Sequence, residues 1–368
     1  MRRAEVLVLG GGIIGCALAE ELARRGRRVI LVERGRVGAE ASSAAAGILA
    51  AQMDIAHPGP FFDLCQAARR MYPGWVRRLE RRSGRRVGFH VDGILYLAST
   101  VAEEQRMARR AEWQRRRGLP VERWSPREVR RREPAIDGRI RCGFWFPAEA
   151  QVDNPRLMQA LAQAARAAGG RLLEQTAVTR LLTRAGRVRG VDTSRGRFEA
   201  PIVVECRGSW SGLAVAGPVR LPVEPLRGQI LAFTGPQRFV RRVVMSERAY
   251  VVQRRDGRLL VGSTIEHAGF DKALTLEGMH AILCGIRSMC SAMDRCRFIE
   301  AWAGFRPSTV DGLPILGATS IEGLFAATGH YRHGILLAPI TAKLLSELIL
   351  NHHTSLDLSP FSSRRFNT

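Results

Sequence analysis

The sequence contains almost no lysine, since Lys272 and Lys343 are the only two among 57 basic residues. Its net charge of +23 therefore depends on arginine. Two arginine-rich stretches, 77–86 and 106–132, are expected to be mostly helical and are compatible with a basic face for nucleic acid. No nucleic-acid-binding motif accompanies this charge. We therefore interpret the two stretches as a solvated surface and do not expect nucleic acid as a partner.

Cysteine pairs and membrane-spanning runs are also missing. The seven cysteines form no C-x-x-C pair and no cysteine–histidine cluster, which disfavours disulfides and zinc and fits reduced thiols. Glu5 and three glycines interrupt the first apolar run, so no signal peptide is indicated. The apolar stretch 335–350 contains Pro339, Lys343 and Glu347, which predicts an amphipathic helix. We expect a cytoplasmic protein with no metal and no membrane span.

The segment 4–33, AEVLVLGGGIIGCALAEELARRGRRVILVE, reads as a strand, a glycine turn, a helix and a second strand. Residues 6–9 form a continuous apolar run, which is typical of a parallel strand buried on both faces. Gly10, Gly12 and Gly15 then match the G-x-G-x-x-G spacing. In this motif the first glycine permits a tight turn, the second admits a pyrophosphate, and the third lets the helix pack closely.

The rest of this segment completes a βαβ unit. The helix is expected to bury Leu18 and Leu22 and to expose Glu20 and Glu21. Glu33 ends the second strand, where an acidic side chain can bind a ribose hydroxyl. Strand, helix, second strand and acid together predict dinucleotide binding.

The later chain changes from parallel to antiparallel patterns. Residues 171–178 and 202–206 are expected to be further strands of the nucleotide-binding domain. Between 221 and 264 the pattern becomes antiparallel, and Asp256 with Gly257 predicts a type I′ hairpin turn. A parallel α/β domain with an inserted antiparallel domain follows from this order.

We predict that both domains are discontinuous. The nucleotide-binding domain is expected to comprise residues 1–85, 150–215 and 305–368, and the substrate-binding domain residues 86–149 and 216–304.

Seven motifs carry a resemblance to a known family. In chain order they are GGGIIG with Glu33, SSAAAGILA at 42–50, QVDNPRLMQAL at 151–161, LRGQILA at 226–232, DGRLLVGSTIEHAGFDK at 256–272, FRPSTVDGLPILG at 305–317 and ATGHYRHGILLAP at 327–339. Their order and spacing resemble the FAD-dependent D-amino-acid oxidase family, and within it the glycine oxidases of thiamine biosynthesis. The resemblance implies an α/β fold, with a Rossmann-like FAD-binding domain and an inserted, mainly antiparallel β substrate domain.

The resemblance also implies site residues. Noncovalent FAD would contact Gly10, Gly12, Ile13, Ile14, Gly15, Glu33, Arg34, Ala41, Ser42, Ala46, Gly47, Ile48 and Val178, and the second glycine turn at His330, Tyr331, Arg332, His333, Gly334, Ile335 and Leu336. The substrate would contact Arg306, Arg332 and Tyr250, with Tyr250 and Arg306 as the catalytic residues. A guanidinium suits bidentate capture of a carboxylate, and a tyrosine beside it can donate a second hydrogen bond.

The implied reaction is the oxidative deamination of a small primary amino acid by oxygen. Glycine would give glyoxylate, ammonia and hydrogen peroxide, with the imine available to the thiazole synthase machinery. Four alternative functions stay open: a sarcosine oxidase, a D-amino-acid oxidase, a flavin oxidoreductase of tRNA wobble-base modification, and a flavin-binding scaffold without catalysis. A homo-oligomer also stays open. The sequence departs from the family pattern in three places. Glu205-Cys206-Arg207 replaces small apolar residues, His333 stands where asparagine is common, and Gln253 stands where proline is common.

Overall fold

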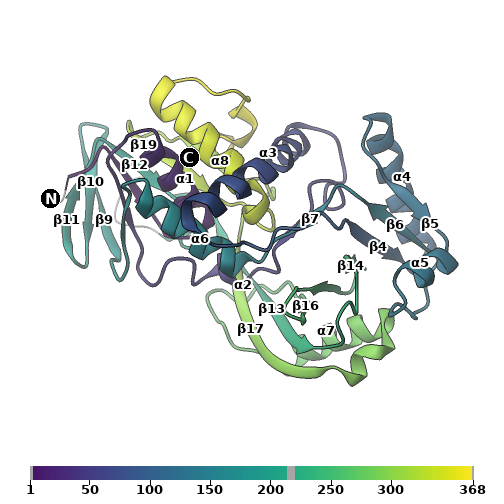
Figure 1. Ribbon diagram of the computed structural model, residues 1–368. Helices are drawn as coiled ribbons and strands as arrows, with labels where there is room; N and C mark the ends of the chain where they lie inside the picture. Colours follow the sequence, from purple (N-terminus) through teal and green to yellow (C-terminus); the bar gives the residue numbers. More distant parts are fainter. Residues whose placement is uncertain (1–2, 214–219, 367–368) are drawn as a thin grey trace.

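The computed structural model describes residues 3–213 and 220–366. The α-helices are α1 (Ile13–Arg24), α2 (Ala41–Ala44), α3 (Pro60–Ser83), α4 (Val101–Arg116), α5 (Pro126–Arg132), α6 (Asn154–Ala167), α7 (Leu276–Met289) and α8 (Gly334–Asn351). Short 3₁₀ helices lie at Gly208–Gly212, Ser291–Arg295, Ser359–Phe361 and Ser363–Phe366. Helices α1, α3, α6 and α8 pack together in one half of the molecule, while α4, α5 and α7 lie in the other (Figure 1).

The first sheet is mostly parallel and has six strands in the order β18-β19-β12-β1-β2-β8. They are β1 (Val6–Leu9), β2 (Val29–Val32), β8 (Arg171–Leu173), β12 (Ile202–Glu205), β18 (Ile315–Ala318) and β19 (Leu324–Thr328). The four residues of β1 are all buried between β12 and β2, which confirms the predicted central strand. The carboxyl ends of β1, β2, β12 and β19 share one edge, where open α/β sheets bind their ligands.

The second sheet has eight strands in the order β17-β13-β16-β15-β14-β4-β6-β5. They are β4 (Ile94–Ala98), β5 (Glu122–Trp124), β6 (Cys142–Phe146), β13 (Glu224–Thr234), β14 (Val243–Met245), β15 (Tyr250–Gln253), β16 (Arg258–Gly262) and β17 (Arg297–Ser308). All neighbours pair antiparallel except β14 and β4. The predicted antiparallel second layer is confirmed, and the domain boundaries stay a prediction.

The strand predicted at 171–178 forms in the parallel sheet, but it is shorter than predicted. β8 ends at Leu173, and Val178 begins a separate three-stranded antiparallel sheet. Its strands are β9 (Val178–Arg184), β10 (Arg187–Thr193) and β11 (Gly196–Glu199). Gln175 has a φ of 53°, a left-handed conformation that interrupts an extended chain. A short pair, β3 (Ile48–Leu49) with β7 (Ala150–Gln151), completes the strands of the described chain.

The hairpin between β15 and β16 forms, but its predicted turn type is wrong. A type I′ turn needs positive φ at both central residues, and Gly257 has a φ of 91° whereas Asp256 is not in the left-handed region. The Gly257 N–H donates to the Arg254 carbonyl at 3.1 Å, so the chain reverses through a longer turn.

Helix α1 is buried on more sides than predicted. Glu20 and Glu21 are 0% and 6% exposed, because α3 covers them and its Arg78 guanidinium lies 3.5 Å from the Glu20 carboxylate. The prediction that these two side chains face solvent is therefore wrong.

Helix α8 is the one helix of the described residues that is long and apolar enough, by length and composition, to cross a membrane. It is 67% buried inside the protein, where it packs against α1 and α3. A buried core helix can meet the same criterion. Its N-terminus follows β19 at the ligand-binding edge of the parallel sheet.

Candidate active site

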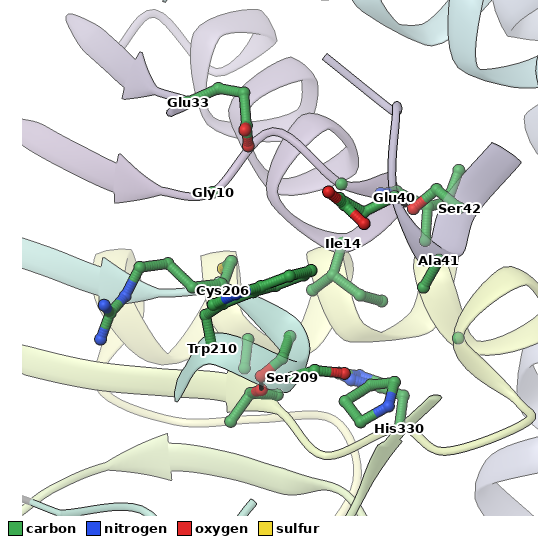
Figure 2. Close-up of a pocket in the computed structure, with 18 of the residues that line it drawn as sticks. Gly10, Ile14, Glu33, Glu40, Ala41, Ser42, Cys206, Ser209, Trp210 and His330 are labelled. Carbon is green, nitrogen blue, oxygen red and sulfur yellow. Dashed lines mark hydrogen bonds between the residues drawn. The ribbon is translucent and has the colours of Figure 1, made fainter. Parts of the chain in front are cut away.

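A cavity of about 380 Å³ lies at the carboxyl edge of the parallel sheet. In Figure 2, Glu33, Glu40 and Ser42 line one side of it, while Ser209, Trp210 and His330 line the other. Among the residues predicted to bind the cofactor, it is lined by Gly10, Gly12, Ile13, Ile14, Glu33, Arg34, Ala41, Ser42, Val178, His330, Tyr331, Arg332, Gly334 and Ile335.

The glycine turn of this cavity has no room for side chains. Gly10 has a φ of 102°, and a Cβ there would lie 2.6 Å from the Cys206 carbonyl oxygen. A Cβ on Gly15 would lie 2.0 Å from the Gly10 carbonyl oxygen. Gly15 lines neither cavity of the site, and its bare backbone instead lets α1 pack against the turn. The backbone of the turn is thereby left open to a ligand.

Two side chains hold the backbone N–H groups around this turn. Ser42 accepts a hydrogen bond from the Ile13 N–H at 2.8 Å, at the N-terminus of α1, where an anion is favoured. The Glu33 carboxylate accepts from the N–H groups of Gly11 and Gly35, both at 2.7 Å. This places an acidic group at the end of β2, as the sequence predicted.

Helix α2 and the loop that follows it are clamped by two buried polar side chains. Asn154 donates to the Ser42 carbonyl at 2.6 Å, and Arg254 donates to the carbonyls of Ala46 and Val152, both at 2.8 Å. Burial lowers the pKa of Arg254 to about 10. These hydrogen bonds fix the path of the loop, which lines a second cavity at Ala46 and Gly47.

The second cavity has a volume of about 240 Å³. Of the predicted residues it is lined by Ala41, Ala46, Gly47, Ile48, Tyr250, Arg306, Tyr331, Arg332, His333, Ile335 and Leu336. Ala41, Ala45, Tyr331, Arg332 and Ile335 line both cavities, so one extended ligand can reach from the first into the second.

Arg306 on β17 presents a guanidinium that is held only by neutral oxygens. It donates to the Thr264 carbonyl at 3.0 Å, to the Ser263 hydroxyl at 2.6 Å and to the Arg227 carbonyl at 3.4 Å. Within the described residues it has no ion pair with an acidic side chain. Burial lowers the pKa of Arg306, but it stays a cation because the ordinary value is 12.5.

Tyr250 on β15 stands beside Arg306. Burial raises the pKa of Tyr250 and the neighbouring Arg306 lowers it, with burial the larger effect, so the phenol stays neutral and can donate. A Cβ on Gly262 would lie 2.4 Å from the Tyr250 oxygen, and a Cβ on Gly228 would lie 2.4 Å from the Arg306 guanidinium. Both polar heads therefore lie against bare backbone.

The second glycine turn brings three more polar residues to the cavities. His330 is 3% exposed, lies 3.1 Å from the Thr341 hydroxyl, and has a pKa lowered to about 3 by burial and then by His333. Tyr331 has a φ of 48°, a left-handed conformation that is uncommon outside glycine. Arg332 lies 3.5 Å from the Asp54 carboxylate, so unlike Arg306 it has an acidic partner.

The comparisons with known proteins identify the family of this chain. The family model described as FAD dependent oxidoreductase (DAO) matches residues 5–348. The chain belongs to this family. That membership confirms the predicted family, the predicted fold class and FAD as the cofactor.

Two similar proteins and one solved structure illustrate the DAO family membership. The glycine oxidase of Geobacillus kaustophilus is 35% identical over 99% of this chain and 97% of its own length. A crystal structure of glycine oxidase from Geobacillus kaustophilus matches with a TM-score of 0.95, at 34% identity and covering 99% of both chains. The bifunctional protein ThiO/ThiG of Synechocystis is 37% identical over 99% of this chain, which spans only 54% of that relative.

The residues of the first cavity fit the FAD that the DAO family uses. The glycine backbone and the N-terminus of α1 suit a pyrophosphate, and Glu33 suits a ribose hydroxyl. No group of three or more metal-ligating side chains occurs among the described residues. The glycine backbone, the N-terminus of α1 and Glu33 thus match a dinucleotide in their chemistry.

Sequence reasoning missed part of the first cavity. The missed lining residues include Glu40, Thr176, Cys206, Arg207, Ser209, Trp210 and Thr328. The Arg34 guanidinium lies 3.8 Å from the centre of the Trp210 ring, and Glu40 binds both Arg34 and Lys272. A usable signal was the GSWSG segment directly after a buried strand, which places small residues and one aromatic at the ligand edge.

The departure at 205–207 has a structural basis. Glu205 accepts from the Arg207 guanidinium at 2.8 Å and from the Ser211 hydroxyl at 3.1 Å. Ser211 in turn lies 2.9 Å from the Thr328 hydroxyl, which lines the first cavity. A paired, hydrogen-bonded network thus takes the place of small apolar residues.

Proposed function

We propose that this protein is an FAD-dependent oxidase of a small primary amino acid, with glycine as the substrate and oxygen as the electron acceptor. The observation that carries the proposal is the Arg306 guanidinium, which lies in a small cavity without an acidic partner in the described chain. A partly dehydrated, unpaired guanidinium favours a carboxylate ligand strongly.

The residues of the second cavity define how such a substrate would be held. Arg306 would bind the carboxylate through two N–H groups, and the neutral Tyr250 would donate a third hydrogen bond. Ile48 and Leu336 line the same cavity with apolar surface, which excludes water around the reacting carbon. FAD, when bound, supplies the two-electron oxidation and passes the electrons on to oxygen.

The second cavity holds a carboxylate–imidazole pair, Asp54 with His333 at 3.3 Å, but the proposed reaction needs no dedicated base. His330 stays neutral because burial lowers its pKa to about 3, and its ring nitrogen is engaged with Thr341. If the amine binds in its neutral form, no protein group has to remove a proton. The protein's contribution is then orientation and electrostatics.

Relatives support a place for this reaction in thiamine biosynthesis. Glycine oxidases from several bacteria are 31–35% identical over nearly the whole chain, and the Synechocystis relative carries ThiO and ThiG in one protein. We infer that the imine product is passed to thiazole assembly or hydrolysed to glyoxylate and ammonia. The free cysteines fit the cytoplasm as the compartment of this reaction.

Peroxide release across a substrate panel tests the proposal. The FAD-loaded protein should oxidise glycine with a higher kcat/KM than sarcosine, D-alanine or D-proline, and an amine without a carboxylate should react poorly. Heat-denatured protein with the same FAD content is the control for free flavin. Preference for sarcosine or for a larger D-amino acid would contradict glycine as the substrate, and no peroxide with any amine would contradict the oxidase itself.

A further inference from the structure

The second cavity contains two arginines whose guanidinium groups have different kinds of partner. Arg306 contacts only neutral oxygens, whereas Arg332 lies 3.5 Å from the carboxylate of Asp54. We propose that Asp54 is the counter-ion that keeps Arg332 from capturing the substrate carboxylate, so that Arg306 alone receives it. This inference rests on the proposed function only in requiring a substrate with a carboxylate. In this proposal Arg332 does not bind the substrate, whereas the resemblance implies that it does.

The short loop before Asp54 is held at every peptide group. The N–H groups of Ala51 and Gln52 donate to the buried Glu149 carboxylate, the first at 2.7 Å and the second at 2.5 Å, and that of Met53 lies 3.4 Å from it. The carbonyls of the same three residues accept from Gln66, from Gln114 and from Arg110. Four side chains from α3, α4 and the segment before β7 thus fix the loop, and a carboxylate mounted in this way has a defined position.

Asp54 faces the second glycine turn with both of its oxygens. One oxygen lies 3.5 Å from Arg332, and the other lies 3.3 Å from the His333 ring nitrogen. Burial raises the pKa of Asp54, but His333, Arg332 and Arg110 together lower it to about 2. The carboxylate is therefore ionised throughout the range in which the enzyme would work.

Removing this one charge would change what the cavity offers to an anion. The Arg332 side chain is 45% exposed and lines both cavities, so it can turn toward a ligand once its partner is gone. The Arg110 guanidinium, which also acts on Asp54, would add to the uncompensated positive charge. Arg332 would then act as a second receptor that holds carboxylates away from Tyr250. Binding of this kind would not orient the substrate for reaction.

The experiment uses Asp54→Asn in the FAD-loaded protein and measures glycolate binding by the change in the flavin absorbance spectrum. We expect the Kd for glycolate to fall about tenfold, and kcat for glycine to fall by a similar factor while KM also falls. A merely structural role for Asp54 would instead weaken glycolate binding or raise KM. Either of those results, or an unchanged Kd, would overturn the proposal.

Two further variants show whether the effect passes through Arg332. Asp54→Asn with Arg332→Met should restore glycolate binding to the level of Arg332→Met alone. Asp54→Asn should also restore measurable glycolate binding to Arg306→Met, which lacks the proposed receptor. Failure of both restorations would contradict the proposal even if the single variant behaved as expected.

The matched control is Asp192→Asn. Asp192 also pairs with two arginines, Arg180 and Arg197, but it lies on β10 of the separate three-stranded sheet. It should leave glycolate binding and glycine turnover unchanged. Because glycolate binding needs no turnover, a wild-type protein that bound glycolate but did not oxidise glycine would contradict the proposed function alone.

Discussion

At the residue scale, the site depends on positions where no side chain would fit. Gly10 and Gly15 bring the β1–α1 turn close to β12 and α1, and Gly228 and Gly262 leave room for Arg306 and Tyr250. A Cβ added at any of these four glycines would lie within 2.6 Å of another atom. Glycine at these positions therefore shapes both cavities.

Gly15→Ala should destabilise the protein by about 3 kcal/mol, because its Cβ would overlap the Gly10 carbonyl oxygen and the backbone cannot easily yield. Gly74→Ala is the matched control: Gly74 is also helical, but nothing lies within 4 Å of the added Cβ. That change should stabilise the protein by about 0.5–1 kcal/mol. Chemical unfolding of both variants measures the difference, and equal stabilities would contradict the packing argument.

The flavin should be released completely by acid precipitation. Of the cysteines, Cys206 lines the first cavity, and burial raises its thiol pKa well above the ordinary value, so it is a poor nucleophile. No cysteine of the described chain lines the second cavity. The absorbance of the supernatant checks this expectation, and yellow colour that stayed in the pellet would indicate a covalent bond.

At the scale of elements, the loop at residues 51–53 shows how distant segments build the site. Its anchor Glu149 is completely buried and follows β6, nearly a hundred residues later in the chain. Burial raises the pKa of Glu149 to about 7, although the N–H groups of Ala51 and Gln52 lower it. The stability that this carboxyl contributes through its raised pKa is complete below about pH 4.5 and is lost as the pH rises through about 7.

Glu149→Gln should therefore cost more stability at pH 5 than at pH 8. The wild type loses the stability contributed by the Glu149 carboxyl as the pH rises, whereas glutamine does not titrate. Chemical unfolding at the two pH values gives the comparison. Glu112→Gln, which removes an exposed carboxylate paired with Arg116 on α4, is the control for the exchange of glutamate for glutamine. A penalty that increased with pH would contradict a raised pKa for Glu149.

The elements that the sequence predicted correctly are those with local causes. The apolar run of β1, the glycine turn and the hairpin at 256–257 each follow from neighbouring residues, and the structure contains all three. The separate sheet that begins at Val178 is an exception, because its three consecutive strands pair locally and the sequence still did not indicate it. The burial of Glu20 depends on Arg78 of α3, far away in the chain. Asp54 could not be predicted for the same reason, since its role depends on Glu149, Arg110 and Arg332.

At the scale of the whole molecule, many surface arginines are engaged in ion pairs, while the net charge of the chain stays at +23. Arg123 and Arg141 both pair with Glu104, and Arg180 and Arg197 both pair with Asp192. Exposed pairs of this kind add little stability, but they occupy charges that nucleic acid would otherwise use. We therefore expect the arginine-rich stretches to be a solvated surface.

RNA binding should accordingly be weak at physiological salt, and amine oxidation should need no nucleic acid. Binding that is purely electrostatic loses affinity steeply as salt rises. Fluorescence anisotropy with a labelled tRNA at two salt concentrations measures it. Tight, tRNA-selective binding that persisted at high salt would favour the tRNA-modifying alternative.

Arg306→Ala tests the central claim most directly, by the kcat/KM for glycine in protein whose FAD content is measured from its visible spectrum. FAD should remain bound, because the glycine turn and Glu33 lie in the other cavity. The kcat/KM should fall by roughly thirtyfold to several thousandfold, which corresponds to about 2–5 kcal/mol. Arg306→Lys should recover only part of the loss, since lysine lacks the planar fork. Glycine oxidation by Arg306→Ala at close to the wild-type efficiency would contradict the account.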